Sequence, residues 1–202
     1  MNRLQLGTAL ALLTLLVLIA PLATRASSEE PAAAGAPAAA APDPAKVERG
    51  RYLVTFAGCN DCHTPWKLGE NGPEPDMTRM LSGHPQDLVM PPPPALGNGP
   101  WSTASSATVT AWSGPWGVSY TRNLTPDNET GLGTWTEKEF VDTLRHGRQR
   151  GIGRELLPPM PWPAFGQASD EDLAAIYAYL RTIPAVSNRV PDPVPPSPPP
   201  SK

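Results

Sequence analysis

The chain has 202 residues, a formal net charge of -3 and 28 prolines. Once a leader and two low-complexity stretches are subtracted, it has room for one domain of about 145 residues with a single core. The weakly acidic balance implies no general affinity for nucleic acid, and the many prolines are incompatible with a purely helical bundle.

The first 26 residues have the features of a secretory signal peptide. Arg3 precedes an apolar run from Leu4 to Ala20, and the small residues around Ala26 suit a cleavage site. We therefore expect an exported protein. An uncleaved membrane anchor through residues 4–23 is the alternative, since a stretch of about 20 apolar residues can cross a bilayer. Residues 27–44, rich in alanine and proline, are expected to form a linker.

A helix is expected from Pro44 to about Phe56, at the start of a domain that spans residues 45–190. Asp43 is placed to cap it, and proline suits the first helical position because its missing N–H costs nothing there. Gly50 in the middle of this helix costs about 1 kcal/mol relative to alanine. We therefore expect another helix to cross closely at Gly50.

Cys59, Cys62 and His63 form the pattern C-x-x-C-H, which is typical of covalent haem attachment. Two thiols three positions apart on one helical turn can reach both vinyl groups at one edge of a porphyrin, and the next residue brings an imidazole to the iron. His63 is therefore the predicted proximal axial ligand. A redox-active dithiol would leave His63 without a role, and a structural zinc site would need about four Cys or His ligands.

Residues 64–120 show no sustained helical or strand period and are rich in proline, glycine and tryptophan. We expect a long, irregular but ordered insertion that wraps over the haem and buries Trp101, Trp112 and Trp116, because large aromatic side chains seldom stay in water. A flexible flap is the alternative. His84 in this segment is expected at the surface rather than at the iron.

A second helix is expected after Thr136, which forms a capping box with Glu139, and Gly147 is placed to end it. His146 near its end is expected at the surface. Four arginines form the only basic concentration, and they could dock a partner, neutralise the haem propionates or form a solvated face: Arg145, Arg148, Arg150 and Arg154.

A proline-rich arm from Leu156 to Pro163 is expected to be non-helical and to hold Met160 rigidly between prolines. A thioether sulfur suits haem iron, so Met160 is the predicted sixth ligand. Three methionines of the insertion compete for this role without such bracing: Met77, Met80 and Met90.

A last helix is expected from Asp170 to about Thr182, capped by Ser169. Its apolar stripe includes Tyr177, which we expect to fit over Gly50 of the first helix. Residues 191–202 are expected to form a disordered, proline-rich tail with no core to join.

Together, the glycine-containing first helix, Cys59-x-x-Cys62-His63, the braced Met160 and the final Leu-x-x-Ile-Tyr-x-Tyr-Leu helix resemble the class I c-type cytochromes. The stretch from Asn123-Leu-Thr-Pro-Asp through Met160-Pro-Trp is similar to the cytochrome c domains of bacterial membrane-bound alcohol and gluconate dehydrogenases. Those subunits carry three C-x-x-C-H motifs, whereas this chain has one. The resemblance implies a mainly α, class I cytochrome c fold with one covalently bound haem c.

The resemblance also implies haem attachment on the outer side of the bacterial inner membrane. We therefore expect a periplasmic electron carrier, not an enzyme, that works between a donor dehydrogenase and a cytochrome or oxidase acceptor. One alternative is a haem enzyme or gas-binding sensor in which Met160 leaves the iron readily. Another is an accessory cytochrome subunit of a membrane dehydrogenase complex.

Overall fold

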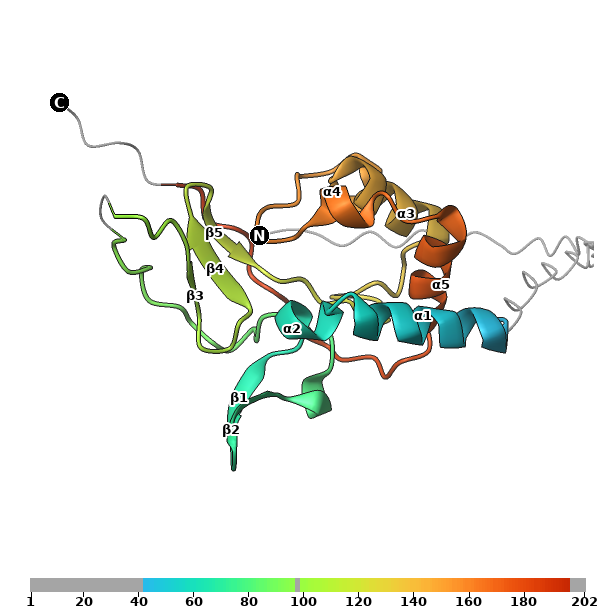
Figure 1. The fold of residues 1–202 in the computed structure, drawn as a ribbon, viewed down its shortest axis with the longest axis horizontal. Helices are drawn as coiled ribbons and strands as arrows, with labels where there is room; N and C mark the ends of the chain where they lie inside the picture. Colours follow the sequence, from blue (N-terminus) through green and yellow to red (C-terminus); the bar gives the residue numbers. More distant parts are fainter. Residues whose placement is uncertain (1–41, 97–98, 197–202) are drawn as a thin grey trace, which may run out of the picture. The chain divides into compact units, whose positions relative to one another are not determined.

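The computed structural model describes residues 42–96 and 99–196. The expected signal peptide, most of the linker and the last six residues of the tail lie outside these ranges. The described part contains five α-helices and two small sheets, which agrees with the expected largely helical domain (Figure 1). The helices are α1 Pro44–Phe56, α2 Cys59–His63, α3 Glu137–His146, α4 Trp162–Phe165 and α5 Asp170–Leu180. No helix within the described ranges is long and apolar enough to span a membrane.

Helices α1 and α5 pack against each other (Figure 1), and their close contact lies at Gly50, as the sequence predicted. The side chain of Asp43 caps α1 by accepting a hydrogen bond from the backbone N–H of Ala45 at 3.0 Å. A Cβ atom on Gly50 would lie 1.9 Å from the carbonyl oxygen of Ala175, so only glycine permits this approach. The expected partner, Tyr177, was wrong, because Gly50 meets the backbone of Ala175 and the Cβ atom of Tyr179. The Tyr177 hydroxyl donates to the carbonyl of Trp135.

Helix α3 has the predicted capping box and ends at Gly147, whose φ of 63° is left-handed. A Cβ atom on Gly147 would lie 2.2 Å from the indole of Trp162, so the end of α3 packs directly against the start of α4. The expectation that the whole proline-rich arm is non-helical was wrong for its last residues. Trp162 and Pro163 begin α4, since proline is tolerated in the first turn of a helix.

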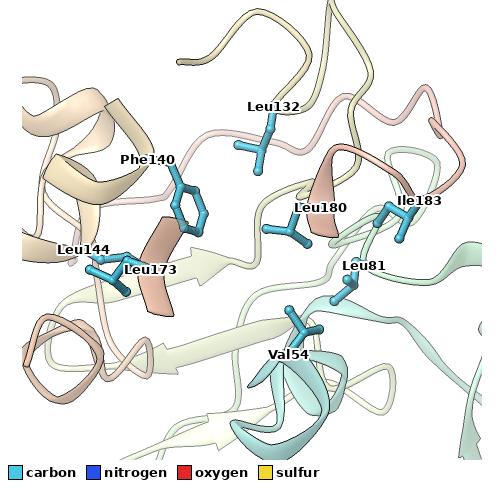
Figure 2. Close-up of a cluster of buried hydrophobic side chains, with 8 residues drawn as sticks. All are labelled: Val54, Leu81, Leu132, Phe140, Leu144, Leu173, Leu180 and Ile183. Atoms are coloured by element: carbon cyan, nitrogen blue, oxygen red, sulfur yellow. The ribbon is translucent and has the colours of Figure 1, made fainter. Parts of the chain in front are cut away.

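The core joins all three longer helices to loops before and after them (Figure 2). Helix α1 contributes Val54, while Leu81 comes from the insertion and is fully buried. The other members come from α3, α5 and the loops that flank them: Leu132, Phe140, Leu144, Leu173, Leu180 and Ile183. Because Leu81 belongs to this core, the insertion is packed into the domain rather than appended to it.

The insertion contains the two sheets, which the sequence did not reveal. Strands β1 Trp66–Gly69 and β2 Gly72–Pro75 form a hairpin, and β3 Ala104–Ser105, β4 Ala111–Gly114 and β5 Gly117–Tyr120 form an antiparallel sheet. Its tryptophans differ in burial: Trp112 and Trp116 are partly buried, whereas Trp101 is 77% exposed, so the expectation was wrong for Trp101.

The described part of the tail also differs from the expectation. Val194 forms two backbone hydrogen bonds with Val118 of β5, at 2.8 and 2.9 Å. Val190, just before the expected tail, is buried. The chain therefore still pairs with the domain beyond residue 191, because β5 offers an unoccupied edge that backbone groups of the tail satisfy.

Candidate functional site

The C-x-x-C-H motif forms the short helix α2, directly after α1. Gly58 precedes it with a left-handed φ of 66°, which turns the chain between the two helices. Cys59 and Cys62 are not joined in a disulfide, and one helical turn presents both thiols. Burial raises the pKa of Cys59 to about 11 and also raises the pKa of Cys62. Redox-active dithiols have a lowered thiol pKa, so the direction of both shifts does not favour that chemistry.

The imidazole of His63 is oriented by a backbone carbonyl. Its Nδ1 atom lies 2.8 Å from the carbonyl oxygen of Arg122, and burial lowers the pKa of the ring. Donation from Nδ1 places the proton there and leaves Nε2 with a free lone pair, which is the state that binds a metal. The backbone carbonyl of His63 in turn accepts from the N–H of Gly83 at 2.7 Å. The structure thus holds His63 as an oriented neutral imidazole.

Hydrogen bonds from the insertion hold the residues next to His63 in place. The hydroxyl of Thr64, which is fully buried, accepts from the N–H of Leu81 and bonds the side chain of Asn60, both at 2.8 Å. Leu81 adopts a left-handed φ of 58°, which is uncommon for a residue other than glycine, and its carbonyl accepts from the N–H of Leu124. Leu81 of the insertion is therefore hydrogen-bonded both to Thr64, directly after His63, and to Leu124, after the end of the insertion.

Met160 is partly buried and packs against the same core as Cys59. Its arm is anchored before the methionine, where the N–H of Leu156 donates to the carbonyl of Gly147 at 2.8 Å and the hydroxyl of Ser119 donates to the carbonyl of Pro158 at 2.6 Å. Helix α4 anchors the arm after it. Among the competing methionines, Met77 is 55% exposed, whereas Met80 also packs against this core.

Three of the four clustered arginines form ion pairs. Arg145 pairs with Asp170, Arg148 with Glu155 and Arg150 with Glu139, at distances between 2.5 and 2.8 Å. These pairs are partly or largely exposed, so each contributes at most about 1 kcal/mol to stability. They leave little free positive charge for docking a partner.

Arg154 behaves differently from the rest of the cluster. Within the described ranges it forms no ion pair, and burial lowers its pKa. Burial, and then the nearby Arg154 guanidinium, also lower the pKa of Arg122. The carboxylate of Asp192 is 92% exposed and 4.0 Å from Arg122, so it compensates this charge weakly. Arg122 could not be identified from the sequence, because nothing near it in the chain indicates that it adjoins His63 and Arg154.

Trp112 carries an indole N–H that is buried without an acceptor among the described residues. Trp112 pairs with Ser119 across β4 and β5, and side chains of directly opposed residues lie on the same face of a sheet. The indole therefore lies on the face from which Ser119 contacts the Met160 arm. A buried donor without a partner costs about 1 to 3 kcal/mol, so this position favours an acceptor from a bound group.

His84 was expected at the surface, and this was wrong. Its side chain is fully buried, with Nδ1 2.9 Å from the hydroxyl of Thr110 and Nε2 3.2 Å from the carbonyl of Leu88. Both ring nitrogens are thus engaged within the insertion, which makes His84 a structural residue. His146 is exposed, as expected.

Comparison with known proteins supports a cytochrome, although no protein-family model matches the chain. It is 29% identical over 170 residues to the fructose dehydrogenase cytochrome subunit of Gluconobacter japonicus, covering 84% of this chain and 26% of that protein. It is 32% identical over 136 residues to the gluconate 2-dehydrogenase cytochrome c subunit of Pantoea cypripedii, covering 67% and 23%. The cytochrome c subunit of the quinone alcohol dehydrogenase of Gluconobacter oxydans is 29% identical over 154 residues, covering 74% and 24%.

The chain is therefore similar to the cytochrome c subunits of dehydrogenases, and the resemblance predicted from the sequence is confirmed. It spans about a quarter of the length of these relatives.

Proposed function

We propose that this chain is an exported, periplasmic cytochrome c with a single haem that carries one electron at a time between a donor dehydrogenase and a respiratory acceptor. The observation that carries the proposal is the geometry of α2, where two thiols share one helical turn with an imidazole whose Nδ1 atom is engaged by the carbonyl of Arg122. The two cysteines of the chain suffice for one haem. The similarity to cytochrome c subunits supports an electron-transfer role.

The residues around α2 fit a haem. Cys59 and Cys62 would hold it through thioethers, and His63 Nε2 and the Met160 sulfur would bind its iron. The unpaired N–H of Trp112 and the weakly compensated charges of Arg122 and Arg154 suit its two carboxylates. When bound, haem supplies reversible one-electron exchange, and the His63 and Met160 ligands would favour a high reduction potential.

Two side chains bound to the iron would imply a carrier rather than an enzyme, because they would leave no open position for a substrate. A haem enzyme or gas sensor would instead have a labile sixth ligand. Carbon monoxide separates these functions. We expect the reduced wild-type protein to bind it weakly or not at all, whereas rapid binding at low carbon monoxide would favour the enzyme or sensor.

Covalent attachment is tested by denaturing electrophoresis followed by a haem-peroxidase stain. The wild-type chain should give one stained band, and a variant with Cys59→Ala and Cys62→Ala should give none. Protein staining of the same gel controls for the amount of chain. Extraction of the haem from the wild-type protein into acidified organic solvent would contradict the proposal.

The names of the relatives favour a second candidate, an accessory cytochrome subunit of a dehydrogenase complex. In that case a mild-detergent extract of the source cells should yield a dehydrogenase bound to this chain. Recovery of the chain alone in the periplasmic fraction would favour the free carrier. The same fractionation tests the uncleaved anchor at residues 4–23, which predicts recovery with the membrane.

A further inference from the structure

Strand β5 and the two residues after it connect the two sides of the proposed haem site. At one end, the carbonyl of Arg122 accepts from Nδ1 of His63 at 2.8 Å. Three residues earlier, the hydroxyl of Ser119 donates to the carbonyl of Pro158 at 2.6 Å, two residues before Met160. An extended chain rises about 3.3 Å per residue, so the three residues from Ser119 to Arg122 can separate these anchor points by about 10 Å.

This segment is held along both edges. Strand β4 pairs with it from Gly117 to Tyr120, and Val194 pairs with Val118 on the opposite edge. Beyond β5, the N–H of Thr121 donates to the carbonyl of Thr110, and the carbonyl of Thr121 accepts from the N–H of His84, both at 2.9 Å. The backbone that carries both anchor points is thus fixed by hydrogen bonds on both sides.

We propose that residues 117–122 fix the position of the Met160 arm relative to His63, and that Ser119 is the positioning residue for Met160. This proposal rests on the proposed function, because it assumes that both side chains bind the haem iron. Ser119 does not touch the iron in this account. It acts through Pro158 on the backbone that presents the methionine sulfur.

The Ser119 hydroxyl is well placed for this role. Ser119 is buried, with 8% of its surface exposed. The other possible acceptor for its hydroxyl, the carbonyl oxygen of Trp112, lies 3.5 Å away, which is too far for a good hydrogen bond. The indole N–H of Trp116 donates to the same hydroxyl at 3.3 Å and so directs its proton toward Pro158. Without this hydroxyl the Pro158 carbonyl would lose its partner, and the arm would have one anchor fewer ahead of Met160.

The test is an optical titration of the oxidised holoprotein with imidazole, which competes with Met160 for the iron. Ser119→Ala should bind imidazole about fivefold more tightly than the wild type, since loss of one hydrogen bond costs about 1 kcal/mol. Ser119→Thr keeps a hydroxyl and should restore wild-type affinity. Ser113→Ala is the matched control, because Ser113 lies on β4 of the same sheet and its side chain has no hydrogen bond to the described arm.

The outcomes separate this inference from the proposed function. If Ser119→Ala melts at a lower temperature but binds imidazole like the wild type, Ser119 only stabilises the sheet and the positioning role is overturned. The same holds if Ser113→Ala changes imidazole affinity as much as Ser119→Ala. If the wild-type protein lacks the sulfur-to-iron absorption band, methionine ligation and with it the positioning role are wrong, whereas the covalent haem of the proposed function is tested separately by the haem-peroxidase stain.

Discussion

Replacing Gly50 by alanine tests the crossing that places α1, and with it the haem-attachment helix. The new Cβ atom would lie 1.9 Å from the carbonyl oxygen of Ala175, 2.6 Å from its carbonyl carbon and 2.8 Å from Cβ of Tyr179. Two of these atoms belong to the backbone of α5, so no side-chain rotation relieves the overlap. The helices must separate by more than about 1 Å to restore ordinary contacts.

Two effects oppose each other in this variant. Alanine gains about 1 kcal/mol over glycine as a helix former, whereas overpacking a tight contact costs about 1 to 3 kcal/mol, and more where backbone must move. Because two of the overlapping atoms are backbone, we expect a steric cost of about 2 to 4 kcal/mol and therefore a net loss of about 1 to 3 kcal/mol. For a domain of this size, that corresponds to a fall in Tm of about 3 to 9 °C.

The assay is thermal unfolding of the holoprotein followed by far-ultraviolet circular dichroism. Gly99→Ala is the matched control, because no atom of the described residues, apart from its chain neighbours, lies within 4 Å of a Cβ added there. Its Tm should stay within about 1 °C of the wild type. A Tm for Gly50→Ala equal to or above that of the wild type would show that α1 and α5 do not meet at this residue.

Two further predictions concern the insertion. Trp112→Phe removes the buried N–H donor that is proposed to bind a haem carboxylate, so the reduction potential should fall, whereas Trp101→Phe at an exposed side chain should leave it unchanged. Identical redox titrations would contradict this role of Trp112. Burial lowers the pKa of His84, so the folded state binds a proton at this ring less readily than the unfolded chain does. The free energy of unfolding should therefore be highest above the unfolded pKa of about 6.5 and should fall as the pH drops below it. The Tm of the wild type should therefore drop more between about pH 7.5 and 5.5 than that of His84→Gln, and equal drops would contradict this prediction.

Features set by local chemistry were predictable from the sequence. Asp43, Thr136 and Ser169 cap the three longer helices as expected, since capping depends on residues two or three positions away. The close crossing at Gly50 was also predictable, because a glycine in mid-helix is destabilising and a close approach of another helix explains its presence. Its partner was not, since the apolar stripe of α5 identifies a face but does not specify whether Ala175 or Tyr177 meets α1.

Features that depend on distant partners were missed. Strands β3, β4 and β5 are only two to four residues long and pair across irregular loops, so they show no alternating pattern. The burial of His84 depends on Thr110, and the pairing of Val194 depends on Val118. The same holds for the proposed site, where the motif identifies His63, but only the fold brings the Arg122 carbonyl to it.

The most direct test of the account is the long-wavelength sulfur-to-iron absorption band of the oxidised protein. We expect the wild type to show this band and Met160→Ala to lose it, with a lower reduction potential and an iron that binds carbon monoxide when reduced. Three controls should keep the band: Met77→Ala, Met80→Ala and Met90→Ala. If the band persists in Met160→Ala and disappears in Met80→Ala, which changes the other methionine packed against the same core, the sixth ligand comes from the insertion and the account is wrong.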